Sequence, residues 1–460
     1  MEKQTTLLIL LVCLLFSIQC FTSNAREAEV ERRQREQLQQ SCRFDRLNAQ
    51  EPTQRITSEG GSVELLNVED SEQFQCAGVA PLRETLNPNA LSLPRYTNTP
   101  TMAYVVEGEG RLGVVFPGCP ETFQSSTSRG GEGQQSQERS QKIRRVRRGD
   151  VVAIPAGVAY WLYNDGNRRL QIVAIADTSN HQNQLDQTYR PFYLAGSAPS
   201  GAQKAAGATS IGDNILQGFD TDTLAEAMGI SQDTARRIQQ NQKKGLIVKV
   251  ERGLRMPGPP SDDYERERER EGNNVEEFYC SMRLRHNADD SEDADVYVRN
   301  GGRLNTVNRL KLPALRSLRL GAERGILQPN AMFAPSWLNA HAVMYVTRGQ
   351  GRIQIVQNEG RRVFDGAVKE GQFLVIPQLH AIAKQAGKDG LEWISFTTSD
   401  SPIRSTLTGR NSVLKAMPQE VVMNAYRING KDARDLRRNR EHETIILSPT
   451  PQHQQPRAIE

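Results

Sequence analysis

Short apolar runs punctuated by glycine and proline dominate the chain. Two stretches show the pattern most clearly, Leu93–Gly113 (LPRYTNTPTMAYVVEGEGRLG) and Arg148–Asp165 (RGDVVAIPAGVAYWLYND). The first predicts a hairpin of two strands turned at Gly108-Glu109-Gly110. The second predicts a strand, a tight turn at Pro155-Ala156-Gly157, and another strand. We therefore expect a mainly β, antiparallel protein.

The same arrangement recurs in the second half of the chain. Pro335–Val356 repeats the first stretch, and Gly371–Gly387 repeats the second. A third block, Val421–Asn439, repeats an amphipathic segment that runs from residue 223 to 241. Three matching blocks in one order predict a duplicated module, a β-barrel followed by a small helical extension. Each barrel can bury its own core, so we expect two domains.

Capping residues predict two helices in the first extension. Thr221 or Asp222 can cap a helix that carries Leu224, and Ser231 can cap a second helix over Gln232–Asn241. The apolar face of such a pair has little of its own domain to cover it, so we expect contact with neighbouring subunits. The matched positions expected to be buried between chains are Leu224, Met228, Val422 and Tyr426.

Two polar segments interrupt the pattern. Ser125–Gln141 is too rich in Ser, Gly and Gln to build a core, so it predicts an insertion in the first barrel. Pro257–Asn274 (PGPPSDDYEREREREGNN) favours an unfolded loop over an exposed single helix. We place the first module at 26–256, this loop at 257–274, and the second module at 275–460.

The first residues predict a cleaved leader. Met1–Ala25 contains Lys3, an apolar run over Leu7–Ile18 and small residues near its end, which is typical of a secretory signal peptide. The apolar run is shorter than the ~20 residues that a membrane-spanning helix needs, and no later segment is longer. We expect the chain to enter the secretory pathway and to have no membrane partner.

Cysteine usage agrees with an oxidising compartment. Two of the six cysteines lie in the leader, and the mature chain keeps four. An even number predicts two disulfides, and the spacing leaves three connectivities open. The four are Cys42, Cys76, Cys119 and Cys280.

Charge argues against nucleic acid as a partner. Lys and Arg number 58 and Asp and Glu 54, and no basic stripe is interleaved with aromatic residues. Amide side chains are abundant, mostly in segments predicted as loops and tails.

The spacing of the second stretch resembles the second signature motif of the cupins, which are small jelly-roll barrels. The spacing runs from Gly149 to Asn164, but Tyr160 stands where cupin enzymes have a metal-binding His. The first stretch resembles the first cupin motif, with other residues in place of its two His and its Glu. Those residues are Thr97, Thr99 and Tyr104. The resemblance implies a retained barrel without the metal site, hence no metal and no cofactor.

The second barrel departs from the enzyme pattern in the same way. Metal chemistry in a bicupin enzyme, the main alternative, needs three imidazoles and a carboxylate around one ion. Residues before 181 include no His, and His341 and His380 lie one and two residues out of register. A two-His site formed by these two remains a second, weaker interpretation. The aligned ligand positions are Leu338, Ala340, Tyr345 and Ile382.

A further alternative is a cupin that binds a small ligand without catalysing a reaction. Such a site needs an aromatic-lined pocket, and Tyr160, Trp161 and Tyr163 are the candidates. Successive residues of a strand face opposite sides, which favours core or subunit contacts for these rings. The sequence has no Gly-rich phosphate loop and no G-x-S-x-G, so we expect no catalytic residues.

A leader, two cupin modules, four mature cysteines and the segment Asn273–Asn287 (NNVEEFYCSMRLRHN) together resemble the 11S globulins, the legumin-type seed storage proteins. The family's processing motif is close to N-G-L/I-E/D-E-x-I/F/Y-C. Here Asn274 replaces the usual Gly, and Val275 replaces the usual Leu or Ile.

This resemblance implies a nutrient reservoir in the protein storage vacuole. It implies a homotrimeric precursor that an asparaginyl endopeptidase cuts between Asn273 and Asn274, followed by a homohexamer. It also implies that Cys42 pairs with Cys76, and that Cys119 pairs with Cys280 to join the acidic and basic chains.

Overall fold

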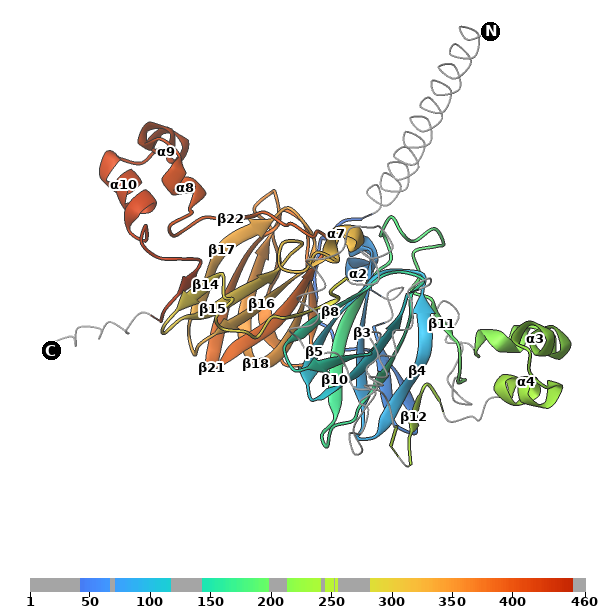
Figure 1. Ribbon diagram of the computed structural model, residues 1–460. Coiled ribbons are helices and arrows are strands. Elements are labelled where there is room, and N and C mark those ends of the chain that lie inside the picture. The colour runs from blue at the N-terminus through green and yellow to red at the C-terminus, as the bar shows by residue number, and fades with distance from the viewer. Residues whose placement is uncertain are drawn as a thin grey trace, which may run out of the picture. The chain divides into compact units, whose positions relative to one another are not determined.

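Figure 1 shows a computed structural model of the chain, which describes residues 42–66, 71–116, 143–197, 213–240, 245–251, 253–254 and 282–449. Several predicted features lie outside the described residues. They are the signal peptide, the insertion at Ser125–Gln141, the loop at Pro257–Asn274 with its cleavage site, Cys119 and Cys280. Residues 46–460 form one compact unit that contains both barrels.

The first module is antiparallel β-structure in two sheets. One sheet has the order β1-β2-β3-β10-β5-β8-β13, in which β13 (Arg285–Asn287) comes from the second half of the chain. The other sheet has the order β11-β4-β9-β6-β7 with β12 added to β4. Apolar residues at alternate positions of these strands face each other and form the core. The strands are β1 (Gln54–Ser58), β2 (Gly61–Leu65), β3 (Val79–Leu86), β4 (Ala90–Thr97), β5 (Thr101–Glu107), β6 (Glu109–Val115), β7 (Ile143–Arg147), β8 (Asp150–Ile154), β9 (Ala159–Tyr163), β10 (Leu170–Asp177), β11 (Pro191–Tyr193) and β12 (Ile247–Lys249), with helix α2 (Glu72–Ala77) before β3.

The second module repeats this plan with longer strands. β18 and β21 each run the length of the barrel, pair with each other, and also pair with strands on both sides. The elements are β13 (Arg285–Asn287), β14 (Val296–Val298), β15 (Gly302–Val307), α7 (Leu315–Leu318), β16 (Gly321–Leu327), β17 (Met332–Leu338), β18 (Ala342–Val356), β19 (Arg362–Lys369), β20 (Phe373–Ile376), β21 (Ala381–Thr397), β22 (Arg404–Thr406) and β23 (Ile446–Leu447). Figure 1 shows the two sets of strands, and the predicted duplication of a β-barrel is confirmed.

The predicted hairpin at Gly108 is wrong. β5 pairs with β8 and β10, whereas β6 pairs with β7 and β9, so the chain crosses from one sheet to the other at this glycine. Gly108 has φ 84°, and a Cβ there would lie 2.3 Å from the Arg169 carbonyl oxygen, so glycine is required. At the matching place in the second module, Gly349 lies at a register shift inside β18 and has φ 76°. Alternation predicted the strands correctly, but it carries no information on their partners.

The two modules exchange short segments. β13 precedes the second barrel in the chain, yet it pairs with β8 of the first barrel through Arg285 and Val152. In return Gln50 pairs with Phe373 of β20, through two backbone hydrogen bonds of 2.8 and 2.7 Å. Each barrel is therefore completed by chain from the other half.

Both helical extensions are present. In the first, α3 (Thr221–Met228) is followed by α4 (Gln232–Gln239), and Ser231 caps α4 by accepting from the Thr234 N–H at 3.2 Å, as predicted. The N-cap of α3 is Asp220, so the prediction of Thr221 or Asp222 as the cap is wrong by one or two residues. The second extension contains α8 (Val413–Ala416), α9 (Gln419–Tyr426) and α10 (Gly430–Arg438).

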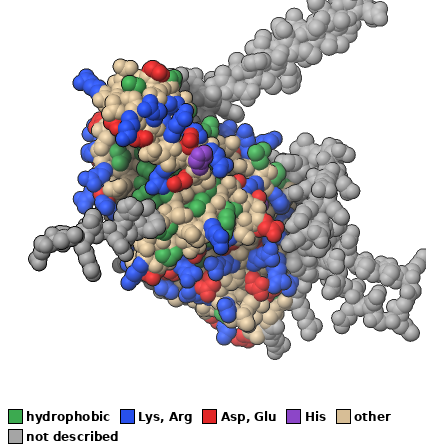
Figure 2. Space-filling model, turned by 90° about the vertical axis from the view of Figure 1, so that its left-hand side faces the viewer, with side chains coloured by type: hydrophobic (Ala, Val, Ile, Leu, Met, Phe, Trp, Pro, Cys, Tyr) green, Lys and Arg blue, Asp and Glu red, His purple; other side chains and the backbone are tan. Residues whose placement is uncertain are grey.

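The expected burial of helix residues between chains needs a correction. Leu224 and Val422 are already buried within their own chain, because each pair of helices packs its apolar residues inward. Met228 and Tyr426, by contrast, are 48% and 54% exposed. Figure 2, which faces the side of Figure 1 where α8–α10 lie, shows many Lys and Arg side chains at the surface. None of the described helices is long and apolar enough to cross a membrane.

Candidate functional site: the barrel interiors

The four predicted ligand positions of the first barrel do not converge. Thr97 donates its hydroxyl proton to the Thr99 carbonyl oxygen at 2.7 Å, at the buried end of β4. Tyr160 on β9 lies inside the barrel. Tyr104 on β5 faces the other way, and its hydroxyl donates to Asp289 of the second half at 3.2 Å. A metal at this place would find no cluster of ligands.

A buried ion pair occupies the interior instead. Arg95 on β4 and Glu84 on β3 are 4% and 2% exposed, and their Nη2 and Oε2 atoms are 2.6 Å apart. Arg95 also donates to Ser92 Oγ at 2.6 Å and to Tyr160 Oη at 3.0 Å. Ser92 donates to Glu84. These bonds satisfy most donors of the guanidinium, which a buried charge requires.

Electrostatics keep the buried Arg95 guanidinium protonated. Burial by itself would lower the pKa of Arg95, but attraction to Glu84 and to neighbouring tyrosines raises that pKa well above its ordinary value. Burial also raises the pKa of the Tyr189 and Tyr193 hydroxyls, so both stay neutral. The cluster is thus a neutral assembly of one cation, one anion and hydroxyl groups.

The second barrel holds a different cluster. Arg404 on β22 pairs with Glu323 on β16 and donates to Ser336 Oγ at 3.0 Å. Lys384 on β21 is 2% exposed, and its ammonium lies 4.3 Å from the Phe333 ring centre.

The same ammonium lies 4.2 Å from the Trp393 ring, which meets the Phe333 ring at 90° with centres 5.8 Å apart. Cation–π attraction offsets part of the cost of burying this lysine. Burial lowers the pKa of Lys384 to about 7, against the opposing attraction of Glu323.

The aligned ligand positions of the second barrel carry no metal ligands. Leu338, Ala340 and Ile382 are buried apolar residues. Tyr345 accepts a hydrogen bond from Arg83 of the first barrel at 3.4 Å and therefore serves the contact between barrels.

His341 and His380 lie on either side of Gln378. The Gln378 N–H donates to His341 Nδ1 at 3.1 Å, so the neutral His341 ring carries its proton on Nε2. A protonated Nε2 is a donor and not a metal ligand, which disfavours a two-His site. Burial, and then the neighbouring His380, lowers the pKa of His341 to about 4. Among the described residues no three His, Cys, Asp or Glu side chains gather as a metal site would require.

The three candidate aromatic residues do not share a pocket. Tyr160 faces the interior, whereas a Cβ on Gly113 would lie 2.1 Å from the Trp161 ring, which therefore packs on β6. Tyr163 donates to Asn89 Oδ1 at 3.4 Å. Strand alternation places Tyr160 on one face of β9 and both Trp161 and Tyr163 on the other.

Sequence reasoning missed the two buried charged clusters. In β3, Glu84 alternates with Leu82 and Leu86, which are both buried, so its parity is that of the core. A carboxylate at a core position was the available signal, because such a group needs a cation inside the barrel. The position of Glu84 does not, however, predict that its partner is Arg95.

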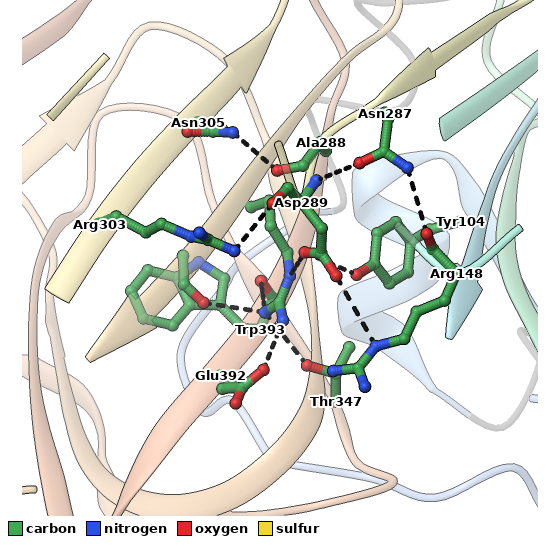
Figure 3. A network of polar contacts seen from close by, with 12 residues as sticks. Tyr104, Arg148, Asn287, Ala288, Asp289, Arg303, Asn305, Thr347, Glu392 and Trp393 are labelled. Carbon is green, nitrogen blue, oxygen red and sulfur yellow. Dashed lines mark hydrogen bonds and ion pairs between the residues drawn. The ribbon is translucent and has the colours of Figure 1, made fainter. Parts of the chain in front are cut away.

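A third polar network joins the barrels (Figure 3). Arg324 of β16 is fully buried and donates to Asp289 Oδ1 at 2.7 Å and to Thr347 Oγ1 at 3.2 Å. It also pairs with Glu392. Tyr104 of the first barrel donates to the same Asp289, so this carboxylate links the two halves.

The contact between barrels is reciprocal. Arg324 lies 5.8 Å from the Tyr104 ring, and Arg83 bonds the Tyr345 hydroxyl. Both the two arginines and the two tyrosines are 241 positions apart in the repeat. Each module thus offers an arginine to the matching tyrosine of the other, as an internal two-fold relation demands.

Cys42 and Cys76 are both disulfide-bonded.

Comparison with known proteins agrees with this architecture. Residues 47–200 and 286–434 match the cupin family. The chain is 44% identical to an 11S globulin seed storage protein of Anacardium occidentale, over 92% of this chain and 96% of that one. It is 42% identical to cocosin 1 of Cocos nucifera, over 96% of both chains.

Solved structures give the same result. Pumpkin seed globulin matches with a TM-score of 0.79 and 38% identity, over 89% of this chain and 100% of that one. The coconut allergen cocosin matches with a TM-score of 0.78 and 40% identity, over 89% and 100%. The fold is therefore that of a two-barrel cupin storage globulin. Within that class the chain belongs to the 11S globulins, the legumin-type family, and its role is seed storage.

Proposed function

We propose that the chain serves only as stored material and catalyses no reaction. The observation that carries this proposal is that the barrels bury complete ion pairs, Arg95–Glu84 and Arg404–Glu323, while the aligned metal-ligand positions carry no set of ligands. A buried pair of this kind must be kept complete, because removal of either partner leaves an unpaired charge. The charged side chains inside the barrels therefore stabilise the fold and are not available for catalysis.

Cavity size argues against the alternative of a small-ligand-binding cupin. The cavity inside the first barrel measures about 30 Å³. Pockets that bind small organic molecules are typically ~300 Å³ or more. The interior is thus too small by roughly a factor of ten.

Elemental analysis of purified protein tests the non-enzymatic proposal. We expect transition metals well below one per chain, since neither barrel offers a set of ligands. About one metal per chain, retained after mild chelation, would contradict the proposal.

Storage of this type involves passage through the secretory pathway into the protein storage vacuole. Met1–Ala25, with the character of a signal peptide, supports this route. The predicted pairing of Cys42 with Cys76 fits the same oxidising route.

The precursor is proposed to be a homotrimer in which the extension of one copy contacts that of the next. Met228 on α3 and Tyr426 on α9 are large exposed apolar residues at matched positions. The two extensions also differ in charge. Residues 220–240 contain four acidic and two basic side chains, and residues 413–438 contain three acidic and six basic ones. Opposite charges favour a head-to-tail contact, which closes into a ring after three copies.

Processing is proposed to follow, with an asparaginyl endopeptidase cutting between Asn273 and Asn274 and a homohexamer forming from two trimers. A recombinant pro-11S globulin of pumpkin, with a TM-score of 0.77 and 39% identity, is a relative in precursor form. The exchange of β13 supports the view that a cut chain stays assembled. The proposed bond between Cys119 and Cys280 would link the two products covalently.

A further inference from the structure

The interior of the first barrel encloses a cavity of about 30 Å³. Strands of both sheets line this cavity, and every lining residue is buried, so it is closed to bulk solvent. One water-sized molecule needs ~10–15 Å³. The cavity therefore has room for a guest about twice that size.

The surface of this cavity is almost wholly apolar, as at Leu112. Four polar side chains belong to the lining, but their polar atoms contribute almost nothing to that surface. Glu84 pairs with Arg95, which also donates to the Tyr160 hydroxyl at 3.0 Å. Thr101 Oγ1 has almost no accessible surface. Among the described residues, a water molecule here would therefore lack the two to four hydrogen-bond partners that it requires.

Two small side chains leave the space open. Ala103 on β5 and Ala174 on β10 pair with each other, and both line the cavity. The second barrel has Met344 and Ser395 at the matching positions, where they also pair with each other. Met344 is fully buried and much larger than alanine, so it occupies space that Ala103 leaves empty.

A third position differs in the same direction. Ile172 lines the cavity, and its match in the second barrel is Trp393, which is fully buried. A Cβ on Gly325 would lie 2.0 Å from the Trp393 ring, so this ring packs directly against the backbone of β16. We therefore expect a guest in the first barrel and none at the matching place in the second.

We propose that the first barrel binds one small apolar molecule in this cavity, a noble-gas atom or a molecule of about two or three heavy atoms such as dioxygen or a two-carbon hydrocarbon. A closed cavity with apolar walls stays dry, and its lining atoms lack contacts that an apolar guest restores. Such a guest is far smaller than the organic ligands that this cavity excludes. The site is additional to the storage role and independent of assembly and processing.

Xenon tests the proposal directly, because it is apolar, compact and strongly scattering. Crystals of the purified full-length protein are pressurised with xenon, and the density inside both barrels is compared. We expect one xenon peak beside Ala103 and Ala174 and none beside Trp393. An ordered water in the first cavity, or no density there under xenon, would overturn the proposal.

Ala174→Val gives a second readout. Its two added methyl groups should enter the cavity and remove the xenon peak. They should also lower the unfolding equilibrium constant about fivefold, since they gain apolar contacts without displacing any atom.

Ala176→Val is the matched control, because Ala176 lies on the same face of β10 and is fully buried but is not part of the cavity lining. This variant should overpack the core, raise the unfolding constant and keep the xenon peak. A xenon peak that survives in Ala174→Val would show that the assigned site is wrong. Should Ala174→Val fail to fold, the wild-type crystal under xenon decides.

Discussion

Lys384 is the residue whose environment is least expected in a barrel core. The cluster around it contains two cations, Lys384 and Arg404, and one carboxylate, Glu323. Two aromatic rings hold the ammonium, but no second anion balances it among the described residues. The second barrel therefore carries one excess buried cation whenever Lys384 is protonated.

We predict that Lys384→Met stabilises the protein in neutral and acid solution. Burial lowers the folded-state pKa to about 7 from 10.5, so between these values the unfolded chain binds more protons than the folded one. Wild-type stability should therefore rise as pH increases from 7 to 10.5, and the full penalty of a few kcal/mol should apply below pH 7. Methionine removes this penalty and keeps the apolar contacts.

Thermal unfolding at pH 6 and pH 10 checks this prediction. The variant's midpoint should exceed the wild-type midpoint at pH 6, and the gap should shrink towards pH 10. Lys388→Met, at an exposed position of the same strand, is the control and should show no such gap. A gap of equal size at both pH values would mean that packing, and not charge, is responsible.

Two matched turns have the same backbone conformation although they carry different residues. Gly157 and Leu379 occupy the same place in the repeat, after Pro155 and Pro377, with φ 73° and 64°. The first turn uses the residue that this conformation favours, and the second does not. The fold imposes the turn even where the local preference opposes it.

At the scale of elements, the helical extensions decide how copies meet. Each buries its own inner face through Leu224 or Val422 and leaves a polar face of opposite charge. Charge complementarity at exposed positions contributes up to about 1 kcal/mol per pair and weakens with salt. Charge complementarity therefore contributes more to the specificity of the contact between extensions than to its affinity.

We predict that charge reversal on one extension weakens assembly and that reversal on both restores it. Glu226→Lys with Asp222→Lys on α3, or Lys431→Glu with Arg434→Glu on α10, should each raise the dissociation constant about tenfold at low salt. The combined variant should recover the wild-type dissociation constant. In a head-to-tail contact its basic first extension would meet the acidic second extension of the next copy.

Light scattering across a dilution series measures this effect. Glu359→Lys on the exposed surface of the second barrel is the control. If the combined variant assembles worse than either parent, like extensions meet, and the head-to-tail arrangement is wrong.

At the scale of the whole molecule, the exchange of segments means that neither half is a closed unit. β13 belongs to the second half of the chain but completes a sheet of the first barrel. Arg324 and Asp289 then connect that strand region to the second barrel and to Tyr104. A cut in the segment that precedes β13 would leave these contacts in place.

We predict that cleavage after Asn273 changes assembly but not barrel fold. The mature chain would give pieces of 248 residues (26 to 273) and 187 residues (274 to 460). If Cys119 pairs with Cys280, denaturing gels should show one band without reductant and two with it. Native sizing under reducing conditions should still show the halves together, because the exchanged strand and the buried network hold them.

Cys119→Ser provides the control for the gel. It should give two bands with or without reductant, while the other disulfide stays intact. Two bands from the wild type without reductant would show that the pairing of Cys119 with Cys280 is wrong.

Local structure and family membership could be predicted from the order of residues alone. Short apolar runs predicted the strands, the repeated blocks predicted two barrels, and Ser231 predicted the start of α4. The replacement of cupin ligands by Thr97, Thr99 and Tyr160 was readable because ligand chemistry depends on residue type. These properties depend on residue type and on residues close together in the sequence.

Which distant segments meet could not be predicted in this way and depends on the complete fold. The fold separated β5 from β6, brought Arg95 to Glu84, exchanged β13 for the segment at Gln50, and covered Leu224 and Val422 within one chain. The two-residue alternation of a strand predicts which side chains face the core. It does not predict the neighbouring strand, because every strand has the same alternation. Pairing is selected by closure of the whole barrel, in which each buried charge must meet a counterion, a hydrogen-bond partner or an aromatic ring, and no single stretch of sequence contains that condition.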